Sequence, residues 1–343
     1  MTPERVLVAM SGGVDSSVAA ALLVEAGYDV TGVTLKLWGG DSDSGCCSVS
    51  DVEDARRVAA QLGVPHYVFN FADDFTRDVV EPYVDAYATG LTPNPCVECN
   101  RSVKFGRLLE RAAALGFDRV ATGHHARVEA TAGAYRLLRG ADHAKDQSYV
   151  LYMLGQRELV RVLLPVGRLT KHEVRERAHA LGLRTAAKPE SMDVCFITRG
   201  DRAAFVGARA TVPAGAIVDT SGAEIGRHAG IASFTIGQRR GVGIALGERR
   251  YVVDVDAASA TVTVGTRDDL ARGEVVVRDL RFVGDRPAAG QCVDVQTRAH
   301  GIPVPAHLVG NTIRFVDAQP RVAPGQVVAL YDADALLGGG IAT

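Results

Sequence analysis

The sequence lacks a long apolar run and a secretory leader. A membrane-spanning helix needs ~20 consecutive apolar residues, and no stretch of the 343 residues approaches that length. A short apolar run follows Arg5, but it breaks at Gly12 and Gly13, which is too early for a signal peptide. We therefore expect a cytoplasmic protein without a membrane partner.

The chain also lacks an excess of positive charge, internal repeats and low-complexity segments. Its formal net charge is −2, with 47% apolar and 23% charged residues, which is ordinary for a globular protein. A nucleic-acid partner would therefore have to meet a local surface rather than an overall basic field. The length of 343 residues predicts two or three domains.

Cysteine occurs six times, and the local sequence predicts a different role for the different positions. Without a leader, these residues are typical of thiols in a reducing compartment rather than of a disulfide scaffold. Cys46 and Cys47 lie in a Gly/Ser/Asp loop and are expected to be incidental. Cys292 lies in an expected strand, where it is predicted to be a buried apolar residue.

Residues 5–183 alternate short β-branched runs with amphipathic stretches. Strands are expected at 6–10, 30–37, 66–70 and 119–122, and helices at 15–26, 51–62, 71–87 and 103–115. This alternation predicts an α/β fold in which a doubly wound parallel sheet is covered on both faces. Two capping boxes, Ser50 with Glu53 and Thr170 with Glu173, mark expected helix starts.

After residue 200 the pattern changes to short alternating runs such as "RYVVDVD", "TVTVG" and "QVVALYD". Glycine, proline and aspartate separate these runs, which is typical of small β-rich modules. Two such modules are expected to meet near Arg272.

The opening segment "VLVAMSGGVDSSVAA" predicts a strand, a tight turn and a helix. Free N–H groups at the helix start and the helix dipole both favour a phosphate. The glycines allow close approach, Ser11, Ser16 and Ser17 supply hydroxyls, and Asp15 could face a magnesium ion that arrives with a nucleotide. The pattern matches neither the common NTPase loop nor the dinucleotide fingerprint, and a plain strand-to-helix turn is the alternative.

The segment "TPNPCVECNRSVKF" places Cys96 and Cys99 just before an expected helix, whose dipole would lower a thiol pKa. Cys195 lies far along the chain, in the polar segment "AKPESMDVCFI". A structural zinc site would need a fourth ligand, and there is no second C-x-x-C. Redox thiols and a three-cysteine iron–sulfur site with one open iron both remain possible from these residues.

Seven ordered segments resemble the tRNA-specific 2-thiouridylases of the ATP-pyrophosphatase (PP-loop) superfamily. They are "AMSGGVDSS", "NPCVECNRSVKF", "ATGHHAR", "AKDQSYVLYML", "KPESMDVCFI", "FTIGQRRGVGI" and "LGGGI". The resemblance implies a PP-loop catalytic domain over 1–200, a central β-rich module over 201–271 and a tRNA-contacting C-terminal β-barrel over 272–343.

The resemblance also implies a reaction. ATP with Mg²⁺ adenylates the 2-carbonyl oxygen of the wobble uridine in tRNA and releases pyrophosphate, because a carbonyl oxygen is otherwise a poor leaving group. Sulfur then comes from a persulfide on Cys195, while Cys99 attacks that persulfide or resolves the intermediate and the pair ends as a disulfide. A persulfide donor protein, either a cysteine desulfurase or a relay carrier, would supply the sulfur.

By the same resemblance, other positions carry over individually. The residues implied to bind ATP are Ala9, Met10, Ser11, Gly12, Gly13, Val14, Asp15, Ser16, Leu35 and Gly123. Those implied to meet the flipped base are Asn94, Pro95, Cys96 and His124. Those implied to contact tRNA are Lys145, Asp146, Gln147, Arg298, Ala299 and Gln326. Cys96 departs from members with aspartate there, and Ala299 replaces an often aromatic residue.

Three other functions are alternatives. An adenylating synthetase for a small molecule would share the ATP loop, but it would need neither Cys99 and Cys195 nor a β-rich tail. Thiolation that depends on an iron–sulfur cluster would use the same scaffold. A non-catalytic RNA-binding module on a degenerate ATPase fold would not need an intact loop at residues 11–17.

Overall fold

The computed structural model describes residues 2–38, 48–189, 194–197, 202–244 and 249–343. Cys46 and Cys47 lie outside these residues. Across the described part of the chain, no helix is long and apolar enough to cross a membrane.

A five-stranded parallel sheet forms the core of the first unit, in the order β3-β2-β1-β4-β7. Its strands are β1 (Arg5–Ala9), β2 (Asp29–Lys36), β3 (His66–Asn70), β4 (Arg119–Ala121) and β7 (Val162–Leu163). The middle residues of β1 are fully buried because side chains from both faces are covered. The predicted parallel sheet is confirmed.

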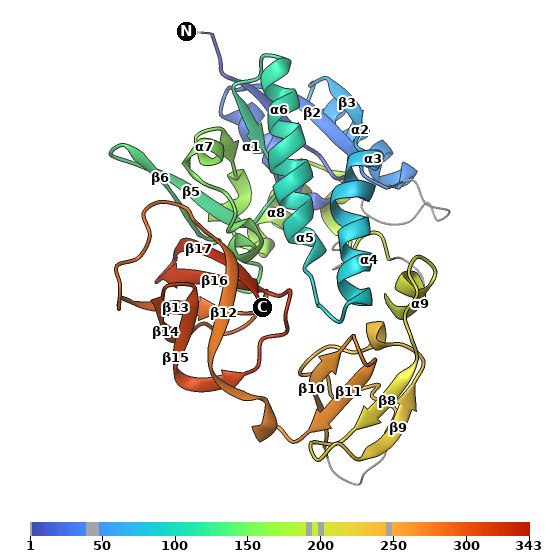
Figure 1. Cartoon of the computed structure of the whole chain (residues 1–343). Coiled ribbons are helices and arrows are strands. Elements are labelled where there is room, and N and C mark those ends of the chain that lie inside the picture. The colour runs from blue at the N-terminus through green and yellow to red at the C-terminus, as the bar shows by residue number, and fades with distance from the viewer. Residues whose placement is uncertain (1, 39–47, 190–193, 198–201, 245–248) are drawn as a thin grey trace.

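Helices cover both faces of this sheet (Figure 1). Val6 and Val8 of β1 pack with α1 (Val14–Glu25), α2 (Val49–Gln61) and α8 (Lys171–Ala180). Leu7 faces the other way, toward two helical columns. The first column is α3 (Ala72–Phe75), η1 (Thr76–Val80) and α4 (Glu81–Ala88), and the second is α5 (Pro95–Glu98), η2 (Cys99–Arg107) and α6 (Leu108–Ala114). The doubly wound arrangement is therefore confirmed.

The second column starts earlier than the expected helix at 103–115. Pro95 occupies the first turn, and the Asn94 side chain caps it by accepting from the Cys96 N–H at 3.1 Å. A proline is well tolerated there because the first N–H groups have no helical partner. The placement of Cys96 and Cys99 just before the helix was wrong, because both lie within its first turns.

The two capping boxes had different outcomes. Thr170 with Glu173 is confirmed at the start of α8. At the start of α2 the box is Ser48 with Asp51, so the predicted pair Ser50 with Glu53 was wrong. Glu53 lies one turn further on and pairs with Arg57 instead.

The central module is a four-stranded sheet in the order β10-β11-β8-β9. Its strands are β8 (Gly215–Val218), β9 (Glu224–His228), β10 (Tyr251–Asp256) and β11 (Thr261–Gly265), preceded by α9 (Arg202–Gly207). Ile217, Val252 and Val262 form part of its own apolar core. Figure 1 shows this sheet at the opposite end of the molecule from β2 and β3.

The C-terminal strands form a closed antiparallel barrel. They are β12 (Ala271–Phe282), β13 (Cys292–Gln296), β14 (Val304–Val309), β15 (Thr312–Pro320), β16 (Val327–Asp332) and β17 (Ala335–Ala342). Pairing of β12 with both β15 and β17 closes the ring. Cys292 is exposed at the start of β13, so its predicted burial was wrong.

A hairpin of the first unit extends this barrel sheet, which the sequence did not predict. It consists of β5 (Ala126–Thr131) and β6 (Ala134–Arg139), and β6 pairs with β17. The remaining short helices are η3 (Ser148–Leu151), α7 (Gln156–Leu159), η4 (Pro165–Arg168), η5 (Arg184–Ala187), η6 (Ile231–Ser233) and η7 (Asp268–Leu270).

Candidate active site

The turn between β1 and α1 leaves the start of α1 available to an anion. Gly13 is the N-cap of α1, and no side chain caps the helix. The Ser17 hydroxyl donates to the Gly13 carbonyl at 2.8 Å, and the Ser16 hydroxyl accepts from the Ser11 N–H at 3.1 Å. These bonds fix the loop while the first helical N–H groups remain for a ligand, as a phosphate site requires.

Two glycines of the site have no room for a side chain. Gly12 has φ +72°, and a Cβ on it would lie 2.3 Å from the Asp51 carbonyl oxygen. A Cβ on Gly123 would lie 2.6 Å from the backbone nitrogen of Ser16. The backbone just after β4 is therefore in close contact with the first turn of α1.

Met10 and Leu35 lie at the carboxyl ends of β1 and β2, next to the turn. Their exposed fractions are 1% and 7%. Parallel sheets of this class bind ligands at that edge. Because both side chains are buried, we expect any contact with a nucleotide to come from their backbone atoms.

Asp15 is held by two residues that the sequence did not identify. Lys171 Nζ lies 2.7 Å from both Asp15 carboxylate oxygens, and His125 Nε2 lies 3.1 Å from Oδ1. Burial would raise the pKa of Asp15, but the hydrogen bonds from His125 and Lys171 outweigh it, so that the pKa is lowered. The Lys171 side chain is 13% exposed, so this charge pair is largely withdrawn from water.

Lys188 reaches the turn from the other side. Its Nζ donates to the Gly12 carbonyl at 3.0 Å, to Asp51 at 2.6 Å and to Asp54 at 2.7 Å. Burial lowers the pKa of Lys188, but the hydrogen bonds to the two carboxylates raise it above its ordinary value. Lys188 lies seven residues before Cys195 and was also missed in the sequence.

The described residues do not form a binding site for a permanently bound metal ion. No group of three His, Cys, Asp or Glu side chains among them is close enough to hold an ion. Mg²⁺ commonly uses one or two carboxylates together with substrate phosphates, so Asp15 fits a magnesium ion that arrives with ATP. Cys96, Cys99 and Cys195 are all described and do not converge, so they do not fit a three-cysteine cluster in this arrangement.

The cysteine segments meet around one aromatic cluster. Cys99 is buried in the core that lines the second face of the sheet, and Cys195 packs against the same core. Phe196, next to Cys195, lies 5.7 Å from Phe75 and 5.2 Å from Tyr83 between ring centroids. Both cysteines are thiols in this structure.

A pocket of about 250 Å³ lies between the two cysteine segments. Its wall has Pro93 and Pro95 on one side, and Val194 and Ile197, which flank Cys195, on the other. Tyr83, Tyr87 and Arg202 complete the lining. The Arg202 guanidinium lies 4.5 Å from the Tyr87 ring and donates to its hydroxyl at 3.2 Å. Tyr83 and Tyr87 are themselves buried, at 3% and 4% exposed, so the Arg202 guanidinium is the plane of this lining that is suited to stacking an unpaired base.

His124 directly follows Gly123, so it lies beside the turn between β1 and α1. We call this turn, residues 11–17, the phosphate loop. It is 9% exposed, and its Nδ1 is 2.7 Å from the Thr122 hydroxyl. Its ring centroid is 5.8 Å from that of Phe105 in η2. The ring is thus held between the end of β4 and the helix that carries Cys99.

The barrel fixes the loop that precedes Cys96. Gln326 Nε2 donates to the Thr92 carbonyl at 2.7 Å, and the Thr92 N–H donates to the Pro324 carbonyl at 2.7 Å. A Cβ on Gly325 would lie 3.0 Å from the Thr92 nitrogen. Gln326 is therefore placed next to the segment of Asn94 and Pro95, two positions expected to meet the base.

Asp146 lies inside the segment that is expected to contact tRNA. It is 5% exposed, and its carboxylate accepts from Arg139 at 2.9 Å and from the Ser148 hydroxyl at 2.9 Å. It also accepts from the Gly140 N–H at 3.0 Å. The carboxylate is therefore engaged within the protein, and the contact of this segment with tRNA stays a prediction.

Arg139 joins the two segments that were expected to contact tRNA. It donates to Gln296 at 2.8 Å, and Gln296 Nε2 donates to the carbonyls of Arg298 and Ala299 at 2.9 Å each. Arg298 and Ala299 are exposed. The structure thus brings residues 145–147 and 298–299 to one surface, although 150 residues separate them in the sequence.

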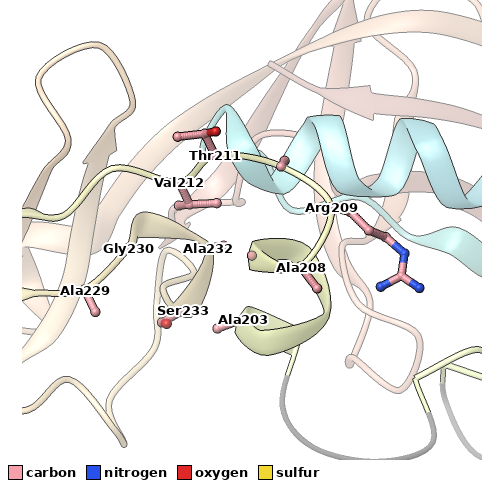
Figure 2. A pocket seen from close by; sticks show the side chains of 11 residues that line it. Ala203, Ala208, Arg209, Thr211, Val212, Ala229, Gly230, Ala232 and Ser233 are labelled. Atoms are coloured by element: carbon pink, nitrogen blue, oxygen red, sulfur yellow. The ribbon is translucent and has the colours of Figure 1, made fainter.

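A larger pocket of about 500 Å³ lies elsewhere, between α9 and the central module. Figure 2 shows that alanine and glycine form much of its lining. Among the described lining residues, Arg209 is the one with a charge, and its guanidinium lies 3.9 Å from the Phe205 ring. These residues include the hydroxyls of Thr211 and Ser233 but no carboxylate or histidine that could activate them, so the size of the pocket does not make it a catalytic site.

Comparison with protein families covers nearly the whole chain. A family model described as "tRNA methyl transferase HUP domain" matches residues 4–199. Models described as "tRNA methyl transferase PRC-barrel domain" and "Aminomethyltransferase beta-barrel domain" match residues 203–266 and 272–342.

Curated relatives match from end to end. A "tRNA-specific 2-thiouridylase MnmA" of Roseiflexus castenholzii is 48% identical over 98% of each chain. The protein with that name from Chloroflexus aggregans is 50% identical over 98% of this chain and 97% of its own. Among solved structures, "U34-tRNA thiolase NcsA from Methanococcus maripaludis with its [4Fe-4S] cluster" is 17% identical with a TM-score of 0.38, covering 61% of this chain and 64% of that one.

Proposed function

The chain belongs to the tRNA-specific 2-thiouridylase family, and we propose that its phosphate loop, Cys99 and Cys195 carry the two steps of tRNA thiolation. The enzyme is a sulfurtransferase that converts the wobble uridine of tRNA to 2-thiouridine at the expense of ATP. The observation that supports this assignment of residues is that the turn between β1 and α1 lies at the carboxyl edge of the parallel sheet, while Cys99 and Cys195 belong to one apolar core on a face of the same sheet.

The activation step takes place at the start of α1. The 2-carbonyl oxygen of uridine attacks the α-phosphorus of ATP, and pyrophosphate leaves. The free N–H groups of α1 and the ammonium of Lys171 stabilise the negative charge of the phosphates. Asp15 would hold a Mg²⁺ ion that arrives with ATP, and the ion would supply further charge neutralisation.

The sulfur step uses the two cysteines. The terminal sulfur of a Cys195 persulfide attacks C2 of the activated base, and AMP leaves with the former 2-oxygen. The Cys99 thiolate then attacks the Cys195 sulfur, which releases 2-thiouridine and forms a Cys99–Cys195 disulfide. An external thiol must reduce this disulfide, and a persulfide donor protein must reload Cys195, before the next turnover.

The pocket between Pro95 and Ile197 receives the flipped uridine. It lies between the cysteine segments, and the Arg202 guanidinium, which lies over the Tyr87 ring, gives it a plane on which a base can stack. Enzymes that modify a base must take it out of the stack. We expect Asn94, Pro95, Cys96 and His124 to surround this route. The segment of residues 145–147, together with Arg298, Ala299 and Gln326, would hold the RNA outside it. Since tRNA is the substrate, we place the enzyme in the cytoplasm.

Each of the three structural units is expected to have its own role in the reaction. Residues 1–200 carry catalysis, residues 201–271 form the central module, and residues 272–343 form the barrel that contacts tRNA. Arg139, Gln296 and Gln326 connect the barrel to the catalytic unit.

Release of pyrophosphate from ATP, measured with and without tRNA, tests the function. We expect release only when tRNA is present, because the accepting oxygen belongs to the RNA. Asp15→Ala should lose pyrophosphate release and thiolation together while its affinity for tRNA changes little. Turnover with a small carbonyl compound in place of tRNA would instead indicate a small-molecule synthetase. Pyrophosphate release by Asp15→Ala together with collapsed tRNA binding would show that the loop had been misassigned.

A further inference from the structure

The segment "GQRRGVGIALGERR", residues 237–250, concentrates positive charge on the central module. It contains four arginines and one glutamate, although the whole chain has a net charge of −2. Arg239, Arg249 and Arg250 line a pocket of about 270 Å³, and the exposed Arg240 adjoins them in sequence. The reaction described above makes no use of these residues.

Three of these arginines lack a carboxylate partner within the described chain. Arg239, Arg240 and Arg249 are exposed, and none takes part in an ion pair there. Arg250 differs, because its charge contributes to lowering the pKa values of Asp219 and Asp269, after the hydrogen bonds from Ser221 and Thr266 respectively. The positive charge without a carboxylate partner in the described chain is therefore that of Arg239, Arg240 and Arg249.

The backbone that carries Arg239 and Arg240 is fixed in place. Gln238 accepts from the Thr235 N–H at 3.0 Å and donates to the Arg240 carbonyl at 3.0 Å. Gly237 and Gln238 also exchange backbone hydrogen bonds with Val252 of β10 at 2.8 and 2.9 Å. Arginines on a preorganised turn lose less backbone entropy on binding a ligand than arginines on a tail would.

This loop borders the surface that we propose contacts tRNA. Nη2 of Arg298 lies 3.9 Å from the position that a Cβ of Gly237 would take. Arg321 of the barrel holds the central sheet through bonds to the Val253 carbonyl at 2.9 Å and to Asp254 at 2.8 Å. Arg298 of the barrel therefore lies close to the turn that carries Arg239 and Arg240, and this turn belongs to the module at the end of the molecule opposite β2 and β3 (Figure 1).

We propose that Arg239, Arg240 and Arg249 bind backbone phosphates of the tRNA outside its anticodon stem–loop. Unpaired guanidinium groups bind phosphate oxygens through charge-assisted hydrogen bonds. The anticodon must reach the pocket between the cysteine segments, whereas the strands of the central module extend away from the catalytic unit (Figure 1), so a contact on that module falls on another part of the folded RNA. This inference rests on the proposed function, because it assumes that the anticodon occupies the catalytic pocket.

Equilibrium binding of full-length tRNA and of a synthetic anticodon stem–loop, over a range of salt concentrations, tests the proposal. The triple variant Arg239→Gln, Arg240→Gln, Arg249→Gln should bind full-length tRNA roughly tenfold more weakly. The slope of log K against log salt should become shallower by about one for each lost phosphate contact. Its affinity for the stem–loop should match that of the unchanged protein.

Two control variants separate charge from folding. The triple lysine variant at the same positions should retain most of the tRNA affinity and the salt slope. Arg227→Gln removes an arginine of the same module that is already paired with Glu224 at 3.2 Å, so it should change neither quantity. The thermal unfolding midpoint of each variant shows whether the module stays folded.

Other results would overturn the proposal. Unchanged affinity and salt slope for full-length tRNA would show that the arginines do not meet RNA. An equal loss for tRNA and stem–loop would place the contact at the anticodon. Normal tRNA binding with impaired sulfur delivery from the donor protein would make this a protein-docking surface. The stem–loop measurement also distinguishes failure of this proposal from failure of the proposed function, which requires that the stem–loop bind.

Discussion

Lys171 places its ammonium nitrogen 2.7 Å from both carboxylate oxygens of Asp15, across 156 residues of sequence. Lys171 is the first residue of α8, and Asp15 lies in the first turn of α1. The two helix starts therefore lie side by side at the turn where we propose that phosphates bind. Lys171 neutralises Asp15 in this structure, and we expect its ammonium to contact a phosphate of bound ATP.

Lys171→Met should disable activation of the base. The change leaves a half-buried carboxylate without its cation beside the incoming phosphates, so we expect KM for ATP to rise by at least about tenfold and pyrophosphate release to fall. Lys171→Arg should recover part of the activity, and tRNA affinity should stay the same in both variants. His172→Gln, on the exposed neighbouring position, is the control. An unchanged KM for ATP in Lys171→Met would show that Lys171 is only a structural partner of Asp15.

Lys188 is expected to orient the phosphate loop. In a trans peptide the carbonyl and the following N–H point in opposite directions, so the Lys188 bond to the Gly12 carbonyl turns the Gly13 N–H away from Lys188. Lys188→Met should raise KM for ATP by roughly tenfold, and Lys188→Arg should restore part of it. The measurement is the steady-state rate of pyrophosphate release.

Arg184 provides a matched control for Lys188. It pairs with the same Asp54 at 3.0 Å, and no hydrogen bond or ion pair connects it to the loop in the described part of the chain. Arg184→Met should therefore leave KM for ATP nearly unchanged. If both variants lost thermal stability and neither changed KM, the ion pairs would hold only the fold.

Substitution of Cys195 should separate the activation step from the sulfur-transfer step. Cys195→Ser should abolish thiolation but retain pyrophosphate release that depends on tRNA, because adenylation does not need a thiol. Oxidation of the unchanged protein should give a Cys99–Cys195 crosslink, detected by mass spectrometry of peptides. Normal thiouridine formation by Cys195→Ser would disprove its role as the persulfide carrier.

Cys96 distinguishes redox thiols from an iron–sulfur site. Cys96→Ala should retain a substantial part of the activity, because the disulfide route uses only Cys99 and Cys195. A cluster with three cysteine ligands would fail when any one is lost. Stoichiometric iron in anaerobically prepared protein, lost together with activity in Cys96→Ala, would therefore contradict the disulfide route.

His66 predicts a loss of stability in mild acid. Burial and the charge of Arg56 lower its pKa below the ordinary value of about 6.5. Between the two pKa values the unfolded chain binds more protons than the folded one, so stability is lost as pH falls below about 6.5. The thermal midpoint should drop less in His66→Gln than in the unchanged protein between about pH 7 and pH 5. Parallel curves for the two proteins would contradict this expectation.

The sequence by itself determined most of the parallel sheet, the helices that cover it and the tight turn between β1 and α1. The β3 boundaries at residues 66–70 were predicted without error, because a short run of aromatic and β-branched residues between turn residues is a local property of the sequence. The tight turn at Ser11-Gly12-Gly13 was predicted correctly for the same reason. The helix start at Pro95 was missed although Asn-Pro marks it, and the Ser48 box was misplaced by two residues because several hydroxyls compete there.

Only the tertiary structure decided which distant side chains complete the site. Asp15 meets His125 and Lys171 across 110 and 156 residues, and Gln326 meets Thr92 across 234 residues. Single lysines and histidines have no periodicity in a sequence, and their partners follow from the order of strands and the crossing of helices. The exposure of Cys292 and the burial of Asp146 depend likewise on which face of a closed barrel or a folded loop each residue occupies, and that is fixed only when the long-range pairings form.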